Sequence, residues 1–482
     1  MTGDPSAPLG RLLLPALRAA PNGGFDHEAA TIEQALRLGA GGFILFGGTA
    51  ESVRALTAEL VRRAGRPLLL ASDLERGAGQ QIAGLSEFPP PLALAALGDL
   101  RAVRWAGAVT GREARAAGLN WAFAPVADLD LLPENPIVQT RAFGSDPEAV
   151  AACVREWVIG CQAAGALACA KHYPGHGRTT VDSHVALPVV DAAAPVLERE
   201  DELPFARAAE AGVAAMMTAH VAYPAWDPSG QAATVSPRIV GRLRRKLGFD
   251  GLVVTDALIM EGALADGGEV RAAVNAVRAG VDLLLYPEAP AAVAAALEAA
   301  VRAGEIPPAR VAEALRRYER ALAAAGAPPP PAPCEPGPFE SPARLADALL
   351  ERGVLRGGAV RLEPPIELVV VDDDLGGPFP PGPSDRVEVA LAPRGVLGRG
   401  GSRVVLAFAE PRAWKGRSGF GPEARAALAH HAPTAALVVL FGHPRLGAEI
   451  PGDAPVLLAW HRQRLMQEAA ARWIAARLRG TA

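Results

Sequence analysis

The chain has 482 residues, of which half are hydrophobic and 21% are charged, and its formal net charge is only −4 at pH 7. A chain of this length is expected to form two or three domains, each with its own core. The small net charge argues against a nucleic-acid or anionic-membrane partner, because proteins that bind such surfaces concentrate Lys and Arg on one face.

Two further features limit the class of protein. The N-terminal residues lack a basic stretch followed by a sustained apolar core, and no window is long and apolar enough to span a bilayer. The four cysteines form no CxxC pair, which argues against a disulfide framework and against a structural zinc site. We therefore expect a soluble cytoplasmic protein that uses no metal or other cofactor.

Residues 1–325 repeat one pattern, in which a short apolar run is followed by a polar loop and an alanine-rich helical stretch. The predicted strands are Leu12–Leu14, Gly42–Phe46, Leu68–Ser72, Leu119–Ala124, Leu167–Ala170, Ala214–Thr218, Leu252–Thr255 and Asp282–Tyr286. The predicted helices are Glu28–Leu38, Ser52–Arg63, Leu100–Ala117, Pro147–Ala164, Glu202–Ala211, Pro237–Lys246, Val270–Ala279 and Ala291–Ala303. Eight such strand–helix units predict a parallel (β/α)8 barrel of the α/β class. A doubly wound sheet is the competing fold, but no GxGxxG turn follows the first run.

Unusual polar residues follow the predicted strands, at the end where barrel enzymes place their active sites. They are Asp73 after the third run, Lys171 and His172 after the fifth, His220 after the sixth, Asp256 after the seventh and Tyr286 at the end of the eighth. The long loop after the fourth run, residues 125–147, carries Arg141. This placement predicts an active site at the carboxyl-terminal ends of the strands.

A second domain is expected after a proline-rich segment at 326–340, which predicts a semi-rigid linker because its prolines cannot continue a helix. Residues 341–482 predict a smaller α/β sandwich domain. Its predicted strands are Ile366–Val371, Val387–Leu391, Val404–Ala409, Ala435–Phe441 and Val456–Trp460. Its predicted helices are Pro342–Arg352, Pro422–His430 and Gln463–Leu478.

The segment 167–188, LACAKHYPGHGRTTVDSHVALP, gathers three histidines, a lysine and an aspartate after a predicted buried strand. Within it, Asp182 lies two residues before His184. A carboxylate beside an imidazole fixes its tautomer, which suits a general acid or base. Loop hydrogen bonds are the alternative explanation for the same pair.

A zinc site is a rival interpretation, because His172, His176, Asp182 and His184 have the side chains that zinc binds. The HxxxH spacing, however, brings both imidazoles to one face only on a helix. Pro174 prevents a helix at this point. The spacing therefore disfavours a metal site.

Asp256 ends a β-branched run in GLVVTDALIMEGA, so it is expected to present a carboxylate at the mouth of the barrel. A helix N-cap is the alternative role for such an aspartate. A cluster of polar side chains, Asp73, Arg141, Lys171 and His172, could hold a hydroxylated ligand. A salt-bridge network at the barrel mouth would use the same residues.

Taken together, these motifs resemble glycoside hydrolase family 3, and most closely its bacterial β-N-acetylglucosaminidases. The resemblance is carried by KHYPGHGRTTVDSHVALP (171–188) and supported by GLVVTDALIMEGA (251–263), NPIVQTRAFGSDP (135–147) and SDLERGAGQ (72–80). The linker and the second α/β domain are similar to the family's two-domain members.

The resemblance implies a retaining, exo-acting enzyme that hydrolyses terminal β-linked GlcNAc from peptidoglycan fragments or chitooligosaccharides through a covalent glycosyl-enzyme. It implies that Asp256 is the nucleophile and that His184 is the acid/base, partnered by Asp182. It further implies sugar-binding roles for Asp73, Arg141, Lys171 and His172. The expected partner is a small carbohydrate substrate.

One departure from the family pattern bears on substrate choice. Members of this branch usually carry DQEGGRVQR where this chain has DLERGAGQQ, so the two arginines of the motif fall on Ala78 and Gln81. A β-glucosidase or β-xylosidase therefore stays open as an alternative within the family.

Other classes of function also stay open. A histidine acid/base is neutral when it acts as a base and does not repel an anion, so phosphorolysis by a β-N-acetylglucosaminide phosphorylase is an alternative to hydrolysis. A non-catalytic, degenerate sugar-binding barrel and a metal-dependent hydrolase are the alternatives outside the retaining glycosidases.

Overall fold

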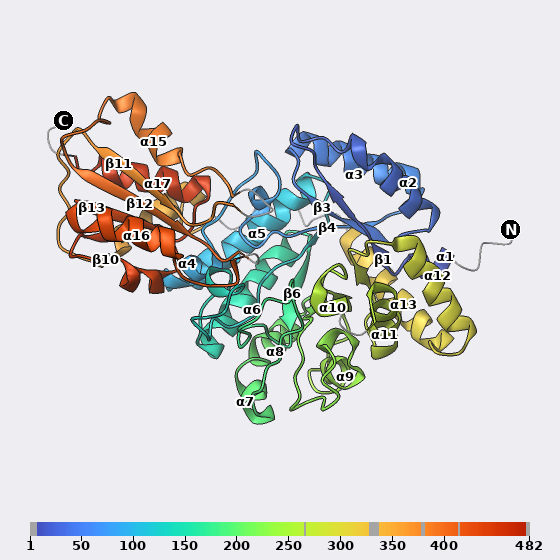
Figure 1. Cartoon of the computed structure of the whole chain (residues 1–482). Coiled ribbons are helices and arrows are strands. Elements are labelled where there is room, and N and C mark those ends of the chain that lie inside the picture. The colour runs from blue at the N-terminus through green and yellow to red at the C-terminus, as the bar shows by residue number, and fades with distance from the viewer. Residues whose placement is uncertain (1–6, 265–266, 327–336, 377–380, 413–414, 479–482) are drawn as a thin grey trace. The chain divides into compact units, whose positions relative to one another are not determined.

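The computed structural model describes residues 7–264, 267–326, 337–376, 381–412 and 415–478. These residues fall into two compact units (Figure 1). The first unit comprises the described residues of Met1–Glu87, Asp99–Leu131 and Ala142–Pro336. The second comprises those of Phe88–Gly98, Leu132–Arg141 and Gly337–Ala482, so two short segments from the predicted barrel group with the second unit. Most of the predicted linker at 326–340 lies outside the described residues.

The first unit is built on parallel strands. Seven of them pair in chain order: β2 (Ala16–Arg18), β3 (Gly42–Phe46), β4 (Leu69–Ser72), β5 (Trp121–Ala122), β6 (Leu167–Tyr173), β7 (Ala215–Thr218) and β8 (Leu252–Thr255). A further parallel pair joins β1 (Leu13–Leu14) to β9 (Leu284–Leu285). The strands β3, β4, β7 and β8 match their predicted apolar runs to within one residue, whereas β5 and β9 are shorter than the predicted Leu119–Ala124 and Asp282–Tyr286. Strand β6 continues three residues beyond its run to include Lys171 and His172.

Backbone hydrogen bonds close these strands into a barrel. Thr255 N donates to Leu283 O at 3.1 Å, which joins β8 to β9. On the other side, Ile44 N donates to Pro15 O at 3.0 Å, which joins β3 to the proline between β1 and β2. Because Pro15 lacks an N–H group, it divides the first barrel strand into β1 and β2. The predicted (β/α)8 fold is confirmed.

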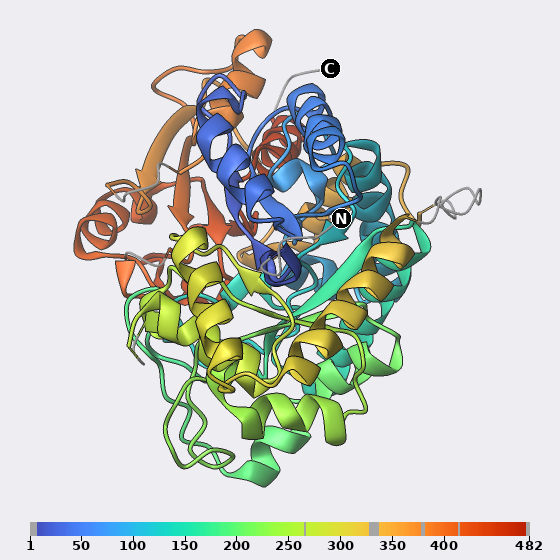
Figure 2. The same ribbon diagram turned by 90° about the vertical axis from the view of Figure 1, so that its right-hand side faces the viewer.

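Helices surround the barrel strands, as Figure 2 shows. The longer ones are α2 (Ala29–Arg37), α3 (Ala50–Ala64), α5 (Leu100–Ala116), α6 (Pro147–Ala163), α8 (Leu203–Glu210), α9 (Pro237–Arg245), α11 (Glu269–Ala279), α12 (Pro290–Arg302) and α13 (Pro308–Gly326). The short ones are α1 (Ala7–Gly10), α7 (Ala194–Arg199) and α10 (Glu261–Leu264). Several of these helices start with an N-cap residue. For example, the Asp146 side chain accepts a hydrogen bond from the Ala149 N–H group at the start of α6.

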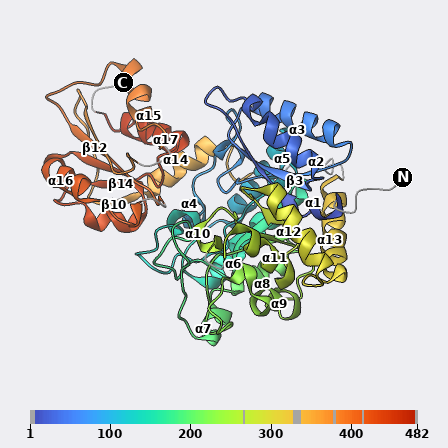
Figure 3. The same ribbon diagram turned by 45° about the vertical axis from the view of Figure 1, so that its right-hand side comes forward.

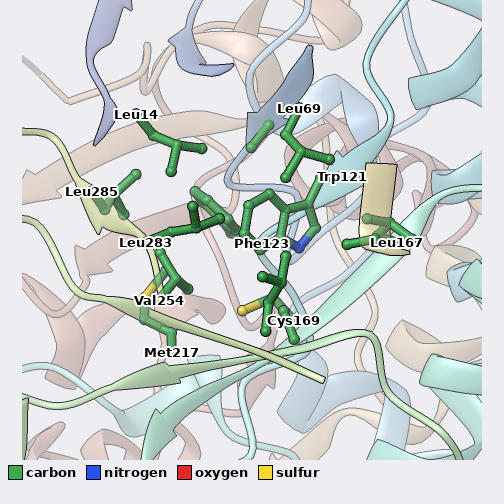
Figure 4. Close-up of a cluster of buried hydrophobic side chains, with 14 of the residues drawn as sticks. Leu14, Leu69, Trp121, Phe123, Leu167, Cys169, Met217, Val254, Leu283 and Leu285 are labelled. Atoms are coloured by element: carbon green, nitrogen blue, oxygen red, sulfur yellow. The ribbon is translucent and has the colours of Figure 1, made fainter. Parts of the chain in front are cut away.

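Alternate residues of the strands fill the barrel interior (Figure 4). The buried cluster takes residues two apart from its strands, including Leu69 with Ala71, Trp121 with Phe123, Leu167 with Cys169, Leu252 with Val254 and Leu283 with Leu285. In a strand, successive side chains point to opposite faces, so the intervening residues face the helices. The interior is therefore packed with side chains, and the next inward-facing position along each strand reaches the mouth of the barrel.

The second unit contains a five-stranded sheet in the order β10–β14–β13–β12–β11. The strands are β10 (Val354–Arg356), β11 (Glu367–Asp372), β12 (Arg403–Ala409), β13 (Leu437–Gly442) and β14 (Val456–Leu458), and only the edge strand β10 is antiparallel to its neighbour. Figures 1 and 3 show its helices around the sheet: α14 (Pro342–Arg352), α15 (Arg386–Leu391), α16 (Pro422–His431) and α17 (Arg464–Ala475). The short α4 (Pro91–Ala96) belongs to this unit. The expected second α/β domain is confirmed.

One predicted strand of this unit is wrong. Residues Val387–Leu391 form most of α15 instead. The run VEVAL alternates like a strand, but its first and last residues are also four apart, which is one helical turn. Val387 and Leu391 are fully buried, whereas Val389 is 51% exposed, so the helical spacing decides which side chains are buried.

Three of the four cysteines lie in the part of the chain that the structure describes. Cys153, Cys161 and Cys169 are buried free thiols, and Cys334 lies outside the described residues. Burial raises the pKa of Cys153 to about 12, which keeps that thiol protonated at neutral pH. None of the described helices combines the length and the apolar character needed to cross a membrane.

A buried aspartate secures the amino-terminal end of β9. Asp282 is fully buried, and its Oδ2 accepts hydrogen bonds from Val253 N at 3.0 Å and Arg244 Nη2 at 2.7 Å. Its Oδ1 accepts from Arg310 and from Arg317, the latter at 3.3 Å. One carboxylate thus ties β8, β9, α9 and α13 together.

We predict that Asp282→Ala lowers the free energy of unfolding by about 3–5 kcal/mol, because it leaves buried guanidinium groups without their carboxylate. Asp250→Ala is the matched control: Asp250 pairs with Arg317 and Arg320 but its side chain is 65% exposed, so the loss should stay within about 1 kcal/mol. Urea denaturation of both variants measures the difference. Equal losses would contradict the prediction.

Candidate active site

Three polar side chains lie at the inward-facing positions that follow the packed interior. Asp73, Lys171 and Asp256 each stand two residues beyond a core residue of β4, β6 and β8. Those core residues are Ala71, Cys169 and Val254. Because parallel strands end at the same edge, the alternation brings the three side chains together at the mouth of the barrel.

A buried lysine connects two carboxylates at this mouth. Lys171 Nζ lies 2.6 Å from Asp73 Oδ1 and 2.7 Å from Glu75 Oε1, and the lysine side chain is only 3% exposed. Glu75 was not among the predicted site residues. The signal that could have found it is the i, i+2 spacing from Asp73, since a buried ammonium group needs compensating negative charge.

His172 faces the site although it directly follows Lys171. The pairing register between β6 and β7 shifts between Lys171 and Tyr173, and such an irregularity lets consecutive residues face the same side. His172 Nδ1 lies 2.7 Å from Asp128 Oδ2, and its Nε2 lies 3.8 Å from Asp256 Oδ2. The imidazole therefore stands between a buried carboxylate and the carboxylate at the end of β8.

Asp128 holds this arrangement and was missed by the sequence analysis. It is completely buried, and its Oδ1 accepts the backbone N–H groups of His172 at 3.2 Å and His176 at 2.7 Å. Its place between apolar residues in PVADLDLL, on the loop after β5, is the signal that could have identified it. A carboxylate in such a stretch needs several donors in order to be buried.

Asp256 is ionised in this environment. Burial raises the pKa of Asp256, but His172, His220, the Ala257 N–H group and His184 lower it further, so the pKa lies below its ordinary value. The Ala257 N–H group donates to Oδ1 at 2.7 Å, but this is not an N-cap bond, because an N-cap side chain accepts from the second or third residue after it and the next helix, α10, begins only at Glu261. The carboxylate is directed at His172 through its other oxygen.

His220, after β7, supports the segment that carries Asp256. Its Nε2 donates to Ala257 O at 3.1 Å, and its Nδ1 lies 2.9 Å from Thr234 Oγ1, which also lies 3.0 Å from Ala219 O. Burial lowers the pKa of His220, which favours the neutral ring.

The second carboxylate–imidazole pair is on the loop after β6. Asp182 Oδ1 accepts from His184 Nδ1 at 2.7 Å and from the His184 backbone N–H at 2.9 Å. Burial raises the pKa of Asp182, but the bonds from His184 outweigh burial and leave it lowered. The Asp182 side chain is 1% exposed and the His184 side chain 48% exposed, so a buried carboxylate orients an imidazole that solvent reaches. The Asp182 carboxylate thus both stabilises the loop through the backbone N–H bond and orients the imidazole, so the two explanations offered for this pair both apply.

This loop is fixed to the segment after Asp256. His176 is buried, with Nδ1 2.7 Å from Thr179 Oγ1 and Nε2 2.9 Å from Ser183 Oγ. Ser183 O in turn accepts the Gly262 N–H at 3.0 Å. A Cβ atom at Gly262 would lie only 3.0 Å from Ser183 O, so a glycine permits this close approach. These contacts bring His184 near enough to influence Asp256.

Arg141, the remaining predicted sugar-binding residue, belongs to a segment that groups with the second unit. It ends a short 3-10 helix, η3 (Gln139–Arg141), and its Nη1 donates to Ile137 O at 3.3 Å. Gln81, where the family usually has arginine, accepts the Gly47 N–H at 3.2 Å. The described residues contain no group of three His, Cys, Asp or Glu side chains arranged to hold a metal ion.

The buried His176 predicts a pH-dependent stability. Burial lowers its pKa to about 4, although the Asp128 carboxylate acts in the opposite direction. The unfolded chain therefore binds a proton at His176 between pH 6.5 and 4 that the folded chain excludes, and stability falls as pH falls through that window. We expect wild type to lose up to about 1.4 kcal/mol per pH unit more than His176→Gln.

Urea denaturation at pH 7 and pH 5 measures this difference. His27→Gln is the control, because the His27 side chain is 51% exposed and should give the wild-type pH dependence. A His176→Gln variant whose stability changes with pH in parallel with wild type would contradict the prediction.

Comparison with known proteins identifies the family to which the chain is similar. Residues 25–321 match the glycosyl hydrolase family 3 N-terminal domain. The β-N-acetylglucosaminidase/β-glucosidase of Cellulomonas fimi is 36% identical over 287 residues, which cover 58% of this chain and 51% of that protein. The chain thus spans about half the length of that relative. A β-hexosaminidase of Chromobacterium violaceum is 39% identical over 270 residues, covering 53% of this chain and 75% of that protein.

The structural comparison extends over both units. A glycoside hydrolase family 3 β-N-acetylglucosaminidase from Paenibacillus sp. FPU-7 has a TM-score of 0.82 at 28% identity, covering 98% of this chain and 97% of that one. The match of the family model to more than half of the chain confirms the resemblance seen in the motifs. The chain belongs to glycoside hydrolase family 3.

Proposed function

We propose that this protein is a retaining, exo-acting β-N-acetylglucosaminidase. The observation that carries the proposal is that the barrel mouth holds an ionised Asp256 and that a nearby loop holds an imidazole, His184, which the buried Asp182 carboxylate orients. A nucleophilic carboxylate must be ionised, whereas the acid/base group must exchange a proton with an exposed oxygen. Two groups with these opposite properties are what a two-step glycosidase needs.

The chemical steps follow from these roles. Asp256 attacks the anomeric carbon while the bond to the leaving oxygen breaks, and protonated His184 gives its proton to that oxygen. The product is a covalent glycosyl-enzyme. Neutral His184 then takes a proton from water as the water oxygen attacks the anomeric carbon and releases Asp256. Asp182 holds Nδ1 throughout, so that Nε2 of His184 carries the exchanged proton.

The proposed substrate is a terminal β-linked GlcNAc on a peptidoglycan fragment or chitooligosaccharide. The names of the relatives from Cellulomonas, Chromobacterium and Paenibacillus support this sugar. Lys171 with Asp73 and Glu75 would present charged partners to the sugar hydroxyls. β-Glucosides and β-xylosides are the alternative substrates, because Gln81 replaces an arginine usual in this branch.

Phosphorolysis is the second candidate, favoured by one observation. The acid/base pair presents an imidazole, not a carboxylate, to the attacking group. A neutral imidazole does not repel an anion, so phosphate could replace water in the second step. Phosphate dependence of turnover and sugar 1-phosphate as product would select this candidate.

We predict that the protein hydrolyses p-nitrophenyl β-N-acetylglucosaminide faster than the corresponding glucoside and xyloside. Asp256→Asn should lower kcat by at least about 10³-fold, because the amide cannot form the covalent intermediate. Asp191→Asn, on an exposed loop, is the control and should retain wild-type turnover. Measurements with and without phosphate distinguish the two second steps. Full activity of Asp256→Asn would refute the assignment of the nucleophile.

A second prediction concerns His184. His184→Gln should lower kcat/KM by about 10²–10⁴-fold for a substrate with a poor leaving group, because that group needs the proton. The loss should be much smaller for dinitrophenyl β-N-acetylglucosaminide, whose leaving group departs without protonation. Steady-state kinetics on both substrates measures the difference. Equal losses would show that His184 is not the acid.

A further inference from the structure

A cluster of three side chains at the barrel mouth has no role in the mechanism above. This rim cluster consists of Arg18 at the end of β2, Phe46 at the end of β3 and Tyr286 directly after β9. The pairing of β2 with β3 places Arg18 opposite Phe46. Because β1 and β2 form the barrel strand beside β9, the rim cluster occupies the part of the mouth between Asp73 and Asp256.

The register of the strands directs Arg18 to the mouth and not to the surrounding helices. Arg18 stands two residues after Ala16, and Phe46 two residues after Ile44, and both earlier residues belong to or pack against the barrel interior. This is the position that Asp256 holds relative to the core residue of its own strand. Arg18 therefore belongs to the same layer of side chains as the site residues.

Aromatic rings fix the orientation of Arg18. Its guanidinium carbon lies 4.2 Å from the centre of the Phe46 ring and 5.4 Å from that of Tyr286. Its Nε donates to Tyr286 Oη at 3.1 Å. The residue is exposed, whereas the two rings are partly buried against the core. A guanidinium group held in this way presents its outer N–H donors in a fixed plane.

The backbone of Tyr286 supports a functional role for this arrangement. Tyr286 has φ +49°, in the left-handed region that a bulky residue adopts only at a cost in free energy. Leu285 already faces the interior, so an extended strand would turn Tyr286 outward. In the observed conformation its ring packs toward the core and its hydroxyl group meets Arg18.

We propose that Arg18 is a specificity-determining residue that binds the terminal sugar. Its outer nitrogens, Nη1 and Nη2, donate hydrogen bonds to ring hydroxyls of the sugar whose anomeric carbon lies at Asp256. Two strand spacings, roughly 10 Å, separate β8 from the strand that carries Arg18. One sugar ring with a hydrogen bond at its far side fits that span. The inference rests on the proposed function, because the orientation of the sugar is taken from Asp256.

Arg18→Met tests the proposal, since methionine keeps an unbranched apolar side chain against Phe46 and removes the donors. We expect kcat/KM for p-nitrophenyl β-N-acetylglucosaminide to fall about 10- to 100-fold, mainly through KM, the range expected for a charged donor. Arg18→Lys should recover part of the loss. Arg320→Met is the matched control, an exposed arginine paired with Asp250 just before β8, at the opposite end of the barrel.

Deoxy substrates identify the contact and exclude a merely structural effect. The loss caused by Arg18→Met should be smaller on at least one of the 3-, 4- and 6-deoxy analogues than on the parent substrate, because such an analogue lacks a hydroxyl that Arg18 binds. An equal loss on all three analogues and on the parent substrate would overturn the proposal. So would unchanged kinetics of Arg18→Met.

Failure of the proposed function is distinguished by a binding measurement. Titration calorimetry of free GlcNAc with Asp256→Asn and with the Asp256→Asn, Arg18→Met double variant needs no turnover. Weaker binding by the double variant supports the role of Arg18 even where wild type hydrolyses none of the substrates. Equal binding by both variants overturns that role.

Discussion

The closure of the barrel, with side chains alternating along each strand, is the constraint on which the rest of the site depends. Inward-facing residues such as Trp121, Phe123 and Val254 pack against one another in the interior. The next inward positions have no space below them and must project from the carboxyl-terminal ends of the strands. Residues far apart in sequence thus form one layer of polar side chains over an apolar core.

Within that layer, ion pairs and hydrogen bonds to neighbouring side chains fix the positions of the charged and ionisable groups. The ammonium group of Lys171 lies between two carboxylates, and His172 lies between Asp128 and Asp256. Groups buried this deeply would be costly if unpaired, so each is stabilised by the partners that surround it. The ionised state of Asp256 is a property of the whole arrangement, since burial alone would raise its pKa.

The two carboxylate–imidazole pairs differ in exposure, and this difference separates their roles. Asp128 and His172 are both buried, so this pair lies beside Asp256 away from solvent. Asp182 is buried but His184 is half exposed, so that imidazole can exchange protons with a leaving group or with water. The hydrogen bonds of His176 and Ser183, together with the close approach at Gly262, hold the exposed imidazole near the barrel mouth.

The sequence by itself determined the strand–helix alternation, the family and most of the polar residues at the strand ends. These features are local: apolar runs, turn formers and the motif from Lys171 to Pro188 can be recognised without knowing what packs against them. Sequence patterning failed at Val387–Leu391, because apolar residues spaced two and four apart fit both the strand and the helix period, and only packing shows which side chains are buried.

Only the tertiary structure identified Asp128, Glu75 and Arg18 as parts of the barrel mouth. Each owes its role to a partner on another strand: His172 for Asp128, Lys171 for Glu75, and the Phe46 and Tyr286 rings for Arg18. Such partners come together when the barrel closes, and a linear pattern does not record which strands become neighbours. The candidate catalytic residues could therefore be identified from local sequence. The charged and aromatic partners that surround the site could be identified only from the closed barrel.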